Sequence, residues 1–388
     1  MQVPATKPFF SEEDIDYITR CFSGILRGES FLSMAQYGRQ FEEKFASYIG
    51  TRYAVACNSG TSALEMLFRA IGIEGREVIL PSNTFLATAI AVINAGGRPV
   101  FADCADDMCL DAEDAAGRIT AATIAIAHVH IGGIVSKSVL RLQEICKEKN
   151  LHLIEDAAQA HGSSLNGIKA GCWGIGAGFS FFSTKVITTG EGGMVTTDDE
   201  RLVEKMRSVR QFGKVKKGVY TNYHTSFGYN WRMPEVSALM GLRQLNSIEM
   251  FIKRRRRIAA IYDEEFEGLD EVKIIRPPQG SVHNYFKYII VLPNHDREKV
   301  HLELEKTGIA PSGYVYEIPL HKLPIFPKKN QLSLPKTEYL CGRHLCLPLF
   351  YSMSDEQARY VAGCLKKILK NKSAIPDGSS RETLPVSS

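Results

Sequence analysis

Short apolar runs alternate with helical patterns between residues 53 and 154, and this alternation restricts the fold more than any other feature of the chain. The runs cover residues 53–57, 77–81, 98–103, 123–130 and 151–154. Each run has the length of a buried strand, and the segments between them carry helical patterns. Repeated strand–helix units favour a mostly parallel sheet with helices on both faces. The sequence therefore predicts an α/β fold.

The chain changes character after about residue 250. We expect a large domain with an N-terminal segment over residues 1–250, a smaller α+β domain over 251–370, and a disordered tail over 371–388. A length of 388 residues is sufficient for two such units. Ser62 with Glu65, and Ser354 with Gln357, fit capping boxes that begin helices.

Composition excludes several classes of protein. A net charge of +4 implies no nucleic-acid groove, and no apolar run is long enough to span a bilayer. The nine cysteines include no Cys-x-x-Cys pair, which favours reduced thiols and a cytoplasmic protein. Cys341 and Cys346 flank His344 at a spacing that suits zinc poorly, so we expect no metal. The basic run 253–257 is interpreted as a solvated helix face or a subunit contact.

A candidate phosphate-binding turn follows the first strand. Residues 58–62, Asn-Ser-Gly-Thr-Ser, lie between that strand and an apolar helix. Unpaired N–H groups and the positive end of the helix dipole converge at such a helix start and attract phosphate. Gly60 and Thr61 are the expected contacts, and the alternative is a plain turn before a well-capped helix.

Lys185 is the candidate nucleophile. An apolar run carrying Phe179, Phe181 and Phe182 predicts a buried strand that leads into Ser183-Thr-Lys and then a glycine-rich turn. Desolvation beside aromatic residues lowers the pKa of an amine, and a neutral lysine can hold an aldehyde as a Schiff base. The alternative is a surface lysine in a turn.

Polar residues follow another strand. Glu155 and Asp156 come directly after residues 151–154, at the sheet edge where open α/β folds bind ligands. A carboxylate there can pair with a protonated pyridine nitrogen, and Gln159 can reach a ring hydroxyl. Phe85, at the start of a helix, is expected either to stack on a flat ligand or to lie in the core. A phosphate turn, a carboxylate and a lysine in this order are the layout of a pyridoxal phosphate enzyme.

His128 and His130 share one face of the strand at 123–130. We expect both to be hydrogen-bonded interior residues rather than ligands.

Five motifs, taken together, carry a family resemblance. They are Asn58-Ser-Gly-Thr-Ser-Ala-Leu, Pro81-Ser-Asn-Thr-Phe-Leu-Ala-Thr, Glu155-Asp-Ala-Ala-Gln-Ala-His-Gly, Phe179-Ser-Phe-Phe-Ser-Thr-Lys and Gly228-Tyr-Asn-Trp-Arg-Met. In this order they resemble the DegT/StrS-type sugar aminotransferases, from about residue 7 to about residue 370. The resemblance implies a fold-type I aminotransferase and a homodimer with active sites at the subunit interface.

The resemblance also implies a role for individual residues. Lys185 carries the Schiff base and Asp156 pairs with the pyridine nitrogen. The remaining cofactor contacts are Gln159 at the ring hydroxyl, Phe85 on the ring, Gly60, Thr61 and Ser180 at the phosphate, and Asn230 from the partner subunit at the same phosphate. In the sugar-facing segment at 314–321, Tyr316 and His321 are candidate substrate contacts, and either can instead be a packed turn residue.

The chain departs from the family pattern at two places. Ser183 stands where related chains usually have proline, which changes the stiffness of the loop rather than its chemistry. Ile131-Gly-Gly stands where they often have Leu-Tyr-Gly, so contacts to the sugar are expected to differ.

The expected function is pyridoxal phosphate-dependent transfer of an amino group from L-glutamate to a nucleotide-linked ketosugar. A 4-keto-6-deoxyhexose is the first choice of acceptor, and a 3-ketosugar or a keto-inositol is the alternative. A hypothesis of another class is a dimeric regulatory protein that kept the fold and lost the chemistry. Lys185 and Asp156 argue against it, because a scaffold needs neither.

Overall fold

A seven-stranded sheet forms the centre of the computed structural model, which describes residues 1–326 and 332–371. The strand order is β1-β9-β8-β5-β4-β2-β3, and only β9 runs antiparallel to its neighbours. The strands are β1 (Tyr53–Cys57), β2 (Glu77–Pro81), β3 (Arg98–Ala102), β4 (Thr123–Val129), β5 (His152–Asp156), β8 (Gly176–Ser180) and β9 (Gly193–Thr197). The predicted α/β fold with a mostly parallel sheet is confirmed.

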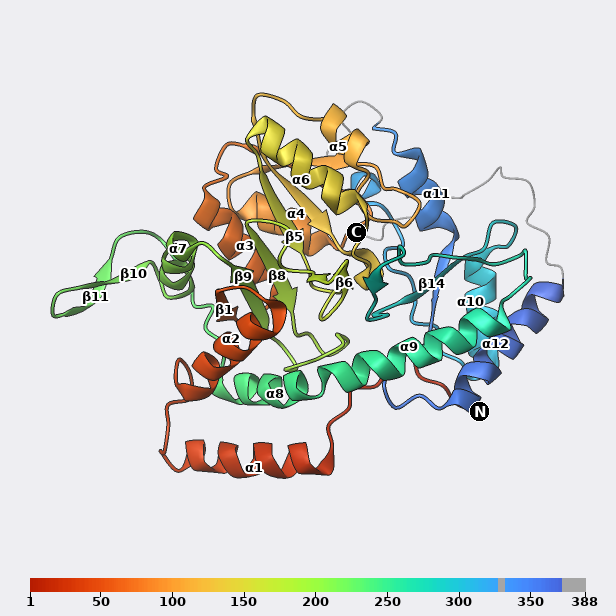
Figure 1. The fold of residues 1–388 in the computed structure, drawn as a ribbon, viewed down its shortest axis with the longest axis horizontal. Coiled ribbons are helices and arrows are strands. Elements are labelled where there is room, and N and C mark those ends of the chain that lie inside the picture. Colours follow the sequence, from red (N-terminus) through yellow and green to blue (C-terminus); the bar gives the residue numbers. More distant parts are fainter. Residues whose placement is uncertain (327–331, 372–388) are drawn as a thin grey trace, which may run out of the picture.

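Helices cover both faces of this sheet (Figure 1). On one face lie α2 (Gln36–Ile49), α5 (Ala112–Gly117), α6 (Ser138–Lys149) and α8 (Glu235–Asn246); on the other lie α3 (Gly60–Ile71), α4 (Leu86–Asn94) and α7 (Glu200–Arg210). Alternate residues of each strand serve the two cores, because side chains point to opposite faces in turn. In β1, Ala54 and Ala56 pack under α2, whereas Val55 and Cys57 pack under α3.

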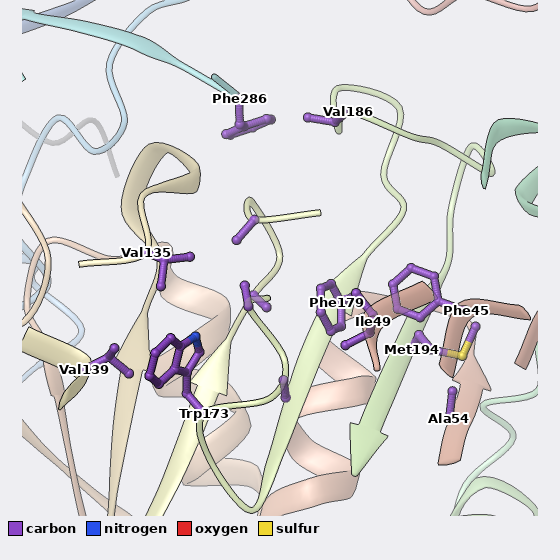
Figure 2. Packing of buried hydrophobic residues seen from close by; sticks show 14 of the residues in the cluster. Phe45, Ile49, Ala54, Val135, Val139, Trp173, Phe179, Val186, Met194 and Phe286 are labelled. Atoms are coloured by element: carbon purple, nitrogen blue, oxygen red, sulfur yellow. The ribbon is translucent and has the colours of Figure 1, made fainter. Parts of the chain in front are cut away.

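An aromatic cluster stiffens the strand that leads to Lys185. Phe179 in β8 packs against Phe45 of α2, with ring centroids 5.0 Å apart, and Met194 of β9 lies beside them (Figure 2). The predicted strand was too long, because β8 ends at Ser180 and Phe182 is 43% exposed. The chain therefore turns out of the sheet earlier than the apolar run suggested.

One predicted helix cap is wrong and another is confirmed. The N-cap of α3 is Ser59, whose hydroxyl accepts a hydrogen bond from the backbone N–H of Ser62. Ser62 lies inside the first turn, so Glu65 cannot complete a box and instead bonds Arg69. The capping box of Ser354 and Gln357 is present at the start of α12 (Asp355–Lys370).

A second sheet lies in the C-terminal part of the chain. It contains β12 (Lys273–Ile274), β14 (Tyr288–Val291) and β15 (His344–Leu347), packed with α9 (Ile248–Glu265), α10 (Arg297–Lys306) and α12 around a core of its own. The expected domain boundary near residue 250 falls inside α9, and the division into domains stays a prediction. The expected tail lies outside the described residues, apart from residue 371.

The basic run 253–257 is not uniformly solvated. Arg254 and Arg257 form ion pairs with Asp355, but Arg255 is buried and donates to backbone carbonyls. The interpretation as a solvated face is therefore wrong for Arg255, because one side of α9 faces the core.

The remaining elements are short or peripheral. The hairpin of β10 (Lys214–Lys217) and β11 (Tyr220–His224) projects from the body, and α1 (Glu12–Leu26) lies along its outside beneath α8 (Figure 1). Others are β6 (Ser164–Leu165), β7 (Ile168–Lys169), β13 (Ser281–Val282), α11 (Pro335–Arg343) and the 3₁₀ turns η1 (Ile131–Gly133) and η2 (Leu320–Lys322). Among the helices in the described ranges, none is long and apolar enough to cross a membrane.

Candidate active site

The Lys185 amine lies beside the Phe286 ring, beyond the end of β8. Its Nζ is 4.7 Å from the centroid of the Phe286 ring, and no hydrogen-bond acceptor reaches it within residues 1–326 and 332–371. Burial lowers the pKa of Lys185 to about 8; the Asp156 carboxylate opposes this shift and the Lys287 charge adds to it. About a tenth of such a lysine is neutral at pH 7, far more than of an ordinary lysine, and the neutral amine is the nucleophilic form. These contacts disfavour the alternative of a surface lysine.

Ser183 holds the loop that carries this lysine. Its hydroxyl donates to the backbone carbonyl of Gly190 at 3.1 Å, which joins the two ends of the loop. The serine that stands in place of the family's proline therefore restrains the loop by a hydrogen bond rather than by a ring.

Asp156 is the last residue of β5, and its carboxylate is 6% exposed. The Thr88 hydroxyl donates to Asp156 Oδ2 at 2.7 Å, and the Ala158 N–H donates to Oδ1 at 3.2 Å. Burial raises the pKa of Asp156 despite these two bonds and the nearby Lys185 charge. A cation placed against this carboxylate favours its ionised form. Thr88 was missed in the sequence, although it lies one helical turn after Thr84 in the second family motif and bonds it at 2.9 Å.

Gln159 has a fixed orientation beside Asp156. Its Oε1 accepts the Gly132 N–H at 2.7 Å, and its Nε2 donates to the Tyr316 hydroxyl. Burial raises the pKa of Tyr316, so the phenol stays neutral. The structure thus brings a predicted cofactor residue and a predicted substrate residue together.

The three expected phosphate contacts also meet. Gly60 and Thr61 open α3, and Ser180 ends β8 next to them. A Cβ on Gly60 would lie 2.6 Å from the Ser180 Cβ, closer than atoms can approach. Only glycine lets this helix start, with its unpaired N–H groups, pack so tightly against Ser180.

Phe85 and Asn230 are both exposed. Phe85 is the N-cap of α4 with a ring 65% exposed, which excludes the alternative of a core position. Asn230 follows the β10–β11 hairpin and is exposed, while the next residue, Trp231, accepts the Asn58 N–H through its carbonyl at 3.0 Å. The Asn230 segment therefore passes the edge of the phosphate turn.

His321 is committed to neighbouring protein groups. Its Nδ1 lies 2.7 Å from the Ser82 hydroxyl and its Nε2 lies 3.1 Å from Glu338 Oε1. With both ring nitrogens occupied, the geometry favours the packed-turn alternative over a substrate contact.

The two histidines expected on one strand differ from one another: His128 lies in β4, whereas His130 follows the strand as the N-cap of η1. His130 Nε2 lies 2.9 Å from Glu155 Oε2, and that carboxylate also accepts the backbone N–H groups of Gly171, Trp173 and Gly174. Glu155 is therefore structural, in contrast to Asp156. His128 is buried, and in the part of the chain that the structure describes neither of its nitrogens has a partner. The expectation of a hydrogen bond is wrong for His128, whose pKa burial lowers well below its ordinary value.

The fold and the site together define an aminotransferase: a lysine amine of lowered pKa, a buried carboxylate and an open helix start lie at one edge of an α/β sheet. Comparison with known proteins places it further. Residues 12–366 match the DegT/DnrJ/EryC1/StrS aminotransferase family, and the chain belongs to that family. Aminotransferases of this family depend on pyridoxal phosphate.

Relatives cover almost the whole chain. The GDP-perosamine synthase of Vibrio cholerae is 31% identical over 94% of this chain and 98% of its own length. The UDP-N-acetyl-3-dehydro-alpha-D-glucosamine 3-aminotransferase of Acidithiobacillus ferrooxidans is 35% identical over 91% and 94%. The crystal structure of Helicobacter pylori PseC, an aminotransferase involved in the biosynthesis of pseudoaminic acid, superposes with a TM-score of 0.89 at 26% identity, over 96% of this chain and 100% of that one.

Proposed function

We propose that this protein uses pyridoxal phosphate to transfer an amino group from L-glutamate to a nucleotide-linked 4-keto-6-deoxyhexose. The observation that carries the proposal is the Lys185 amine, half-buried near Asp156 and without a hydrogen-bond acceptor in the described structure. A 3-ketosugar stays the alternative acceptor, because one relative by name acts at that position.

The residues fit the cofactor. The α3 start at Gly60 and Thr61, with Ser180, would hold its phosphate, and Asp156 would hold its pyridine nitrogen. Gln159 and Phe85 would hold the ring hydroxyl and the ring face. Gly60 lies close to Ser180, and among the described residues no acceptor bonds the Lys185 amine. A cofactor with a phosphate and an aldehyde requires both features.

When bound, the cofactor supplies an electron sink for the negative charge that develops at the α-carbon of the amino donor. Lys185 Nζ would hold the cofactor. When free, the amine can take the α-carbon proton of the donor, since its lowered pKa leaves it partly unprotonated. Asp156, ionised against the ring nitrogen, would keep that nitrogen protonated. Thr88 fixes the direction of the carboxylate by its hydrogen bond.

Acceptor identity can be tested directly. L-Glutamate first converts the bound cofactor to its amino form, and small molecules are then removed. The protein is next offered a panel of nucleotide-linked 4-keto and 3-keto sugars and keto-inositols. The proposal expects a 4-keto-6-deoxyhexose nucleotide to restore the visible absorption band of the aldehyde cofactor fastest. Restoration by keto-inositols or 3-ketosugars alone would replace the acceptor, and no conversion by L-glutamate would replace the donor.

We also propose a homodimer in which Asn230 reaches the cofactor phosphate of the partner subunit. The β10–β11 hairpin and the segment after it expose large apolar side chains, including Val219 at 91% and Phe227 at 100%. Side chains of this kind on a projecting element mark an interaction surface. Asn230 is exposed on the same segment.

Mixing two defective chains tests whether the subunits share their active sites. A Lys185→Ala chain and an Asn230→Ala chain are dissociated together and reassembled, and activity is measured at limiting cofactor. In each mixed dimer one site collects both defects, and the other joins Lys185 of one chain with Asn230 of its partner. Random pairing makes about a quarter of all sites intact, so activity should exceed the mean of the parents. Exchange of subunits without any gain would show that Asn230 acts within its own chain or takes no part in the site.

A further inference from the structure

Three basic groups lie next to Phe286, two at its ring and one at its backbone carbonyl, and we call them the basic cluster: Lys185, Lys287 and Arg255. The Nζ atoms of Lys185 and Lys287 lie 4.7 Å and 5.4 Å from the centroid of this ring. The Arg255 guanidinium donates to the Phe286 carbonyl at 3.1 Å. Throughout residues 1–326 and 332–371, neither Lys287 nor Arg255 forms an ion pair with a carboxylate.

The basic cluster has unused hydrogen-bond donors. Lys287 Nζ carries three N–H groups and makes one bond, to the Ser312 carbonyl at 2.7 Å. Arg255 donates from Nε and Nη2 to the carbonyls of residues 284–286, and its Nη1 makes no bond to a residue in the described ranges. An anion can accept hydrogen bonds from these donors, and such charge-assisted bonds are stronger than those between neutral groups.

The charges of the basic cluster also favour an anionic ligand. Burial lowers the pKa of Lys287, and it lowers the pKa of Arg255 to about 9. Lys185 and Arg255 line one small cavity of about 20 Å³ together with Lys7; no Asp or Glu lines this cavity, and Lys287 lies outside it. Of the carboxylates in the described structure, Asp156 is the one that acts on this lysine, and it would be engaged by the cofactor ring. Positive groups without a counter-ion in a buried site attract a negatively charged ligand.

Lys287 is fixed close to the cofactor residues. Its backbone N–H donates to the Gly132 carbonyl at 3.2 Å, and Gly132 in turn donates to Gln159 Oε1. The same loop carries Asn284, whose Nδ2 donates to the Gln159 carbonyl at 2.8 Å. The loop that positions Lys287 is therefore attached to the edge of the cofactor site at two points.

Gly132 also leaves space beside Lys287. It occupies the place of the tyrosine in the family's Leu-Tyr-Gly, and its φ is +65°. A Cβ there would lie 2.7 Å from Ile289 Cδ1 and 3.9 Å from the Lys287 Cβ. With glycine at 132, no side chain from this turn stands beside Lys287.

We propose that Lys287 binds a carboxylate of the amino donor, with Arg255 supplying further positive charge behind Phe286. This inference rests on the proposed function and deepens it. Lys185 and Lys287 approach the same ring, so a carboxylate held by Lys287 keeps the rest of the donor within reach of the Lys185 amine. The ligand class is an α-amino dicarboxylate or its keto acid. The acceptor carries its negative charge on the nucleotide phosphates rather than on the sugar that reacts, and the test below separates the two ligands.

The test separates the two halves of the reaction. Lys287→Met keeps the length of the side chain and removes the charge. The concentration of L-glutamate that half-saturates conversion of the cofactor to its amino form should rise about 10- to 100-fold, as for the loss of one charge-assisted hydrogen bond. The rate with the ketosugar should change less than about threefold. Lys287→Arg should restore most of the affinity for L-glutamate.

Binding without turnover gives a second readout. Glutarate, a dicarboxylate without an amino group, is titrated calorimetrically into cofactor-free protein, and Lys287→Met should weaken its binding by a similar factor. Lys205→Met is the matched control, because Lys205 also makes a single bond, to the Ala70 carbonyl at 3.0 Å, on α7 at the far end of α3. The control should leave both values unchanged.

The outcomes are distinct. Affinities for L-glutamate and glutarate within twofold of wild type in a folded Lys287→Met protein would overturn the inference. If chloride and acetate displaced glutarate equally well, the site would bind anions in general. That result would overturn the inference as well. A wild-type protein that converts its cofactor with no amino acid would instead contradict the proposed function.

Discussion

A Lys185→Ala variant is expected to lose turnover by at least about 10²-fold, because general acid–base catalysis alone contributes 10²–10⁴-fold and the covalent attachment is lost as well. The variant should still bind pyridoxal phosphate through Asp156 and the phosphate turn. Steady-state rates with L-glutamate and the acceptor found in the panel provide the measurement.

Lys205→Ala is the control, since it removes a lysine of α7 that takes no part in the site. Both variants should melt near the wild-type temperature. Turnover of Lys185→Ala above about a hundredth of wild type would exclude Lys185 as the base that moves the α-carbon proton.

An Asp156→Asn variant should slow both half-reactions by about 10²- to 10³-fold, the usual effect of removing one group that stabilises charge in a transition state. Asparagine can still accept the Thr88 hydroxyl, so the packing is kept while the charge that holds the pyridine nitrogen protonated is lost. Stopped-flow absorbance measures each half-reaction separately.

Thr88→Val provides the comparison for Asp156. It removes the 2.7 Å hydrogen bond to the carboxylate and keeps the charge, so a smaller loss is expected than for Asp156→Asn. Half-reaction rates of Asp156→Asn equal to those of wild type would mean that the carboxylate serves only the fold.

Residues at the ends of strands were accessible from the sequence. Gly60, Asp156 and Lys185 each follow an apolar run, and the carboxyl ends of parallel strands meet at one edge of a sheet. Local pattern therefore sufficed to bring them together. The same local pattern did not fix the ends of the helices and strands. β8 stops at Ser180, and α3 begins before the capping box that its sequence suggested.

Residues that act on the site from other elements were not accessible. Lys287 and Phe286 reach Lys185 from a loop about a hundred positions later that leads into β14, and nothing in their local sequence specifies that approach. In the sequence, Arg255 looks like one of several solvated arginines. Its burial depends on which side of α9 meets the loop at 284–286, and the local sequence does not specify that side. Such contacts are set by tertiary packing rather than by spacing.

The location of the covalent bond tests the central claim most directly. Wild-type protein loaded with pyridoxal phosphate is reduced with borohydride and digested, and the pyridoxyl group is located by peptide mass spectrometry. The account predicts loss of the visible band and one modification, on Lys185. A modification on Lys287 or another lysine, or an absorption band that borohydride leaves intact, would contradict it.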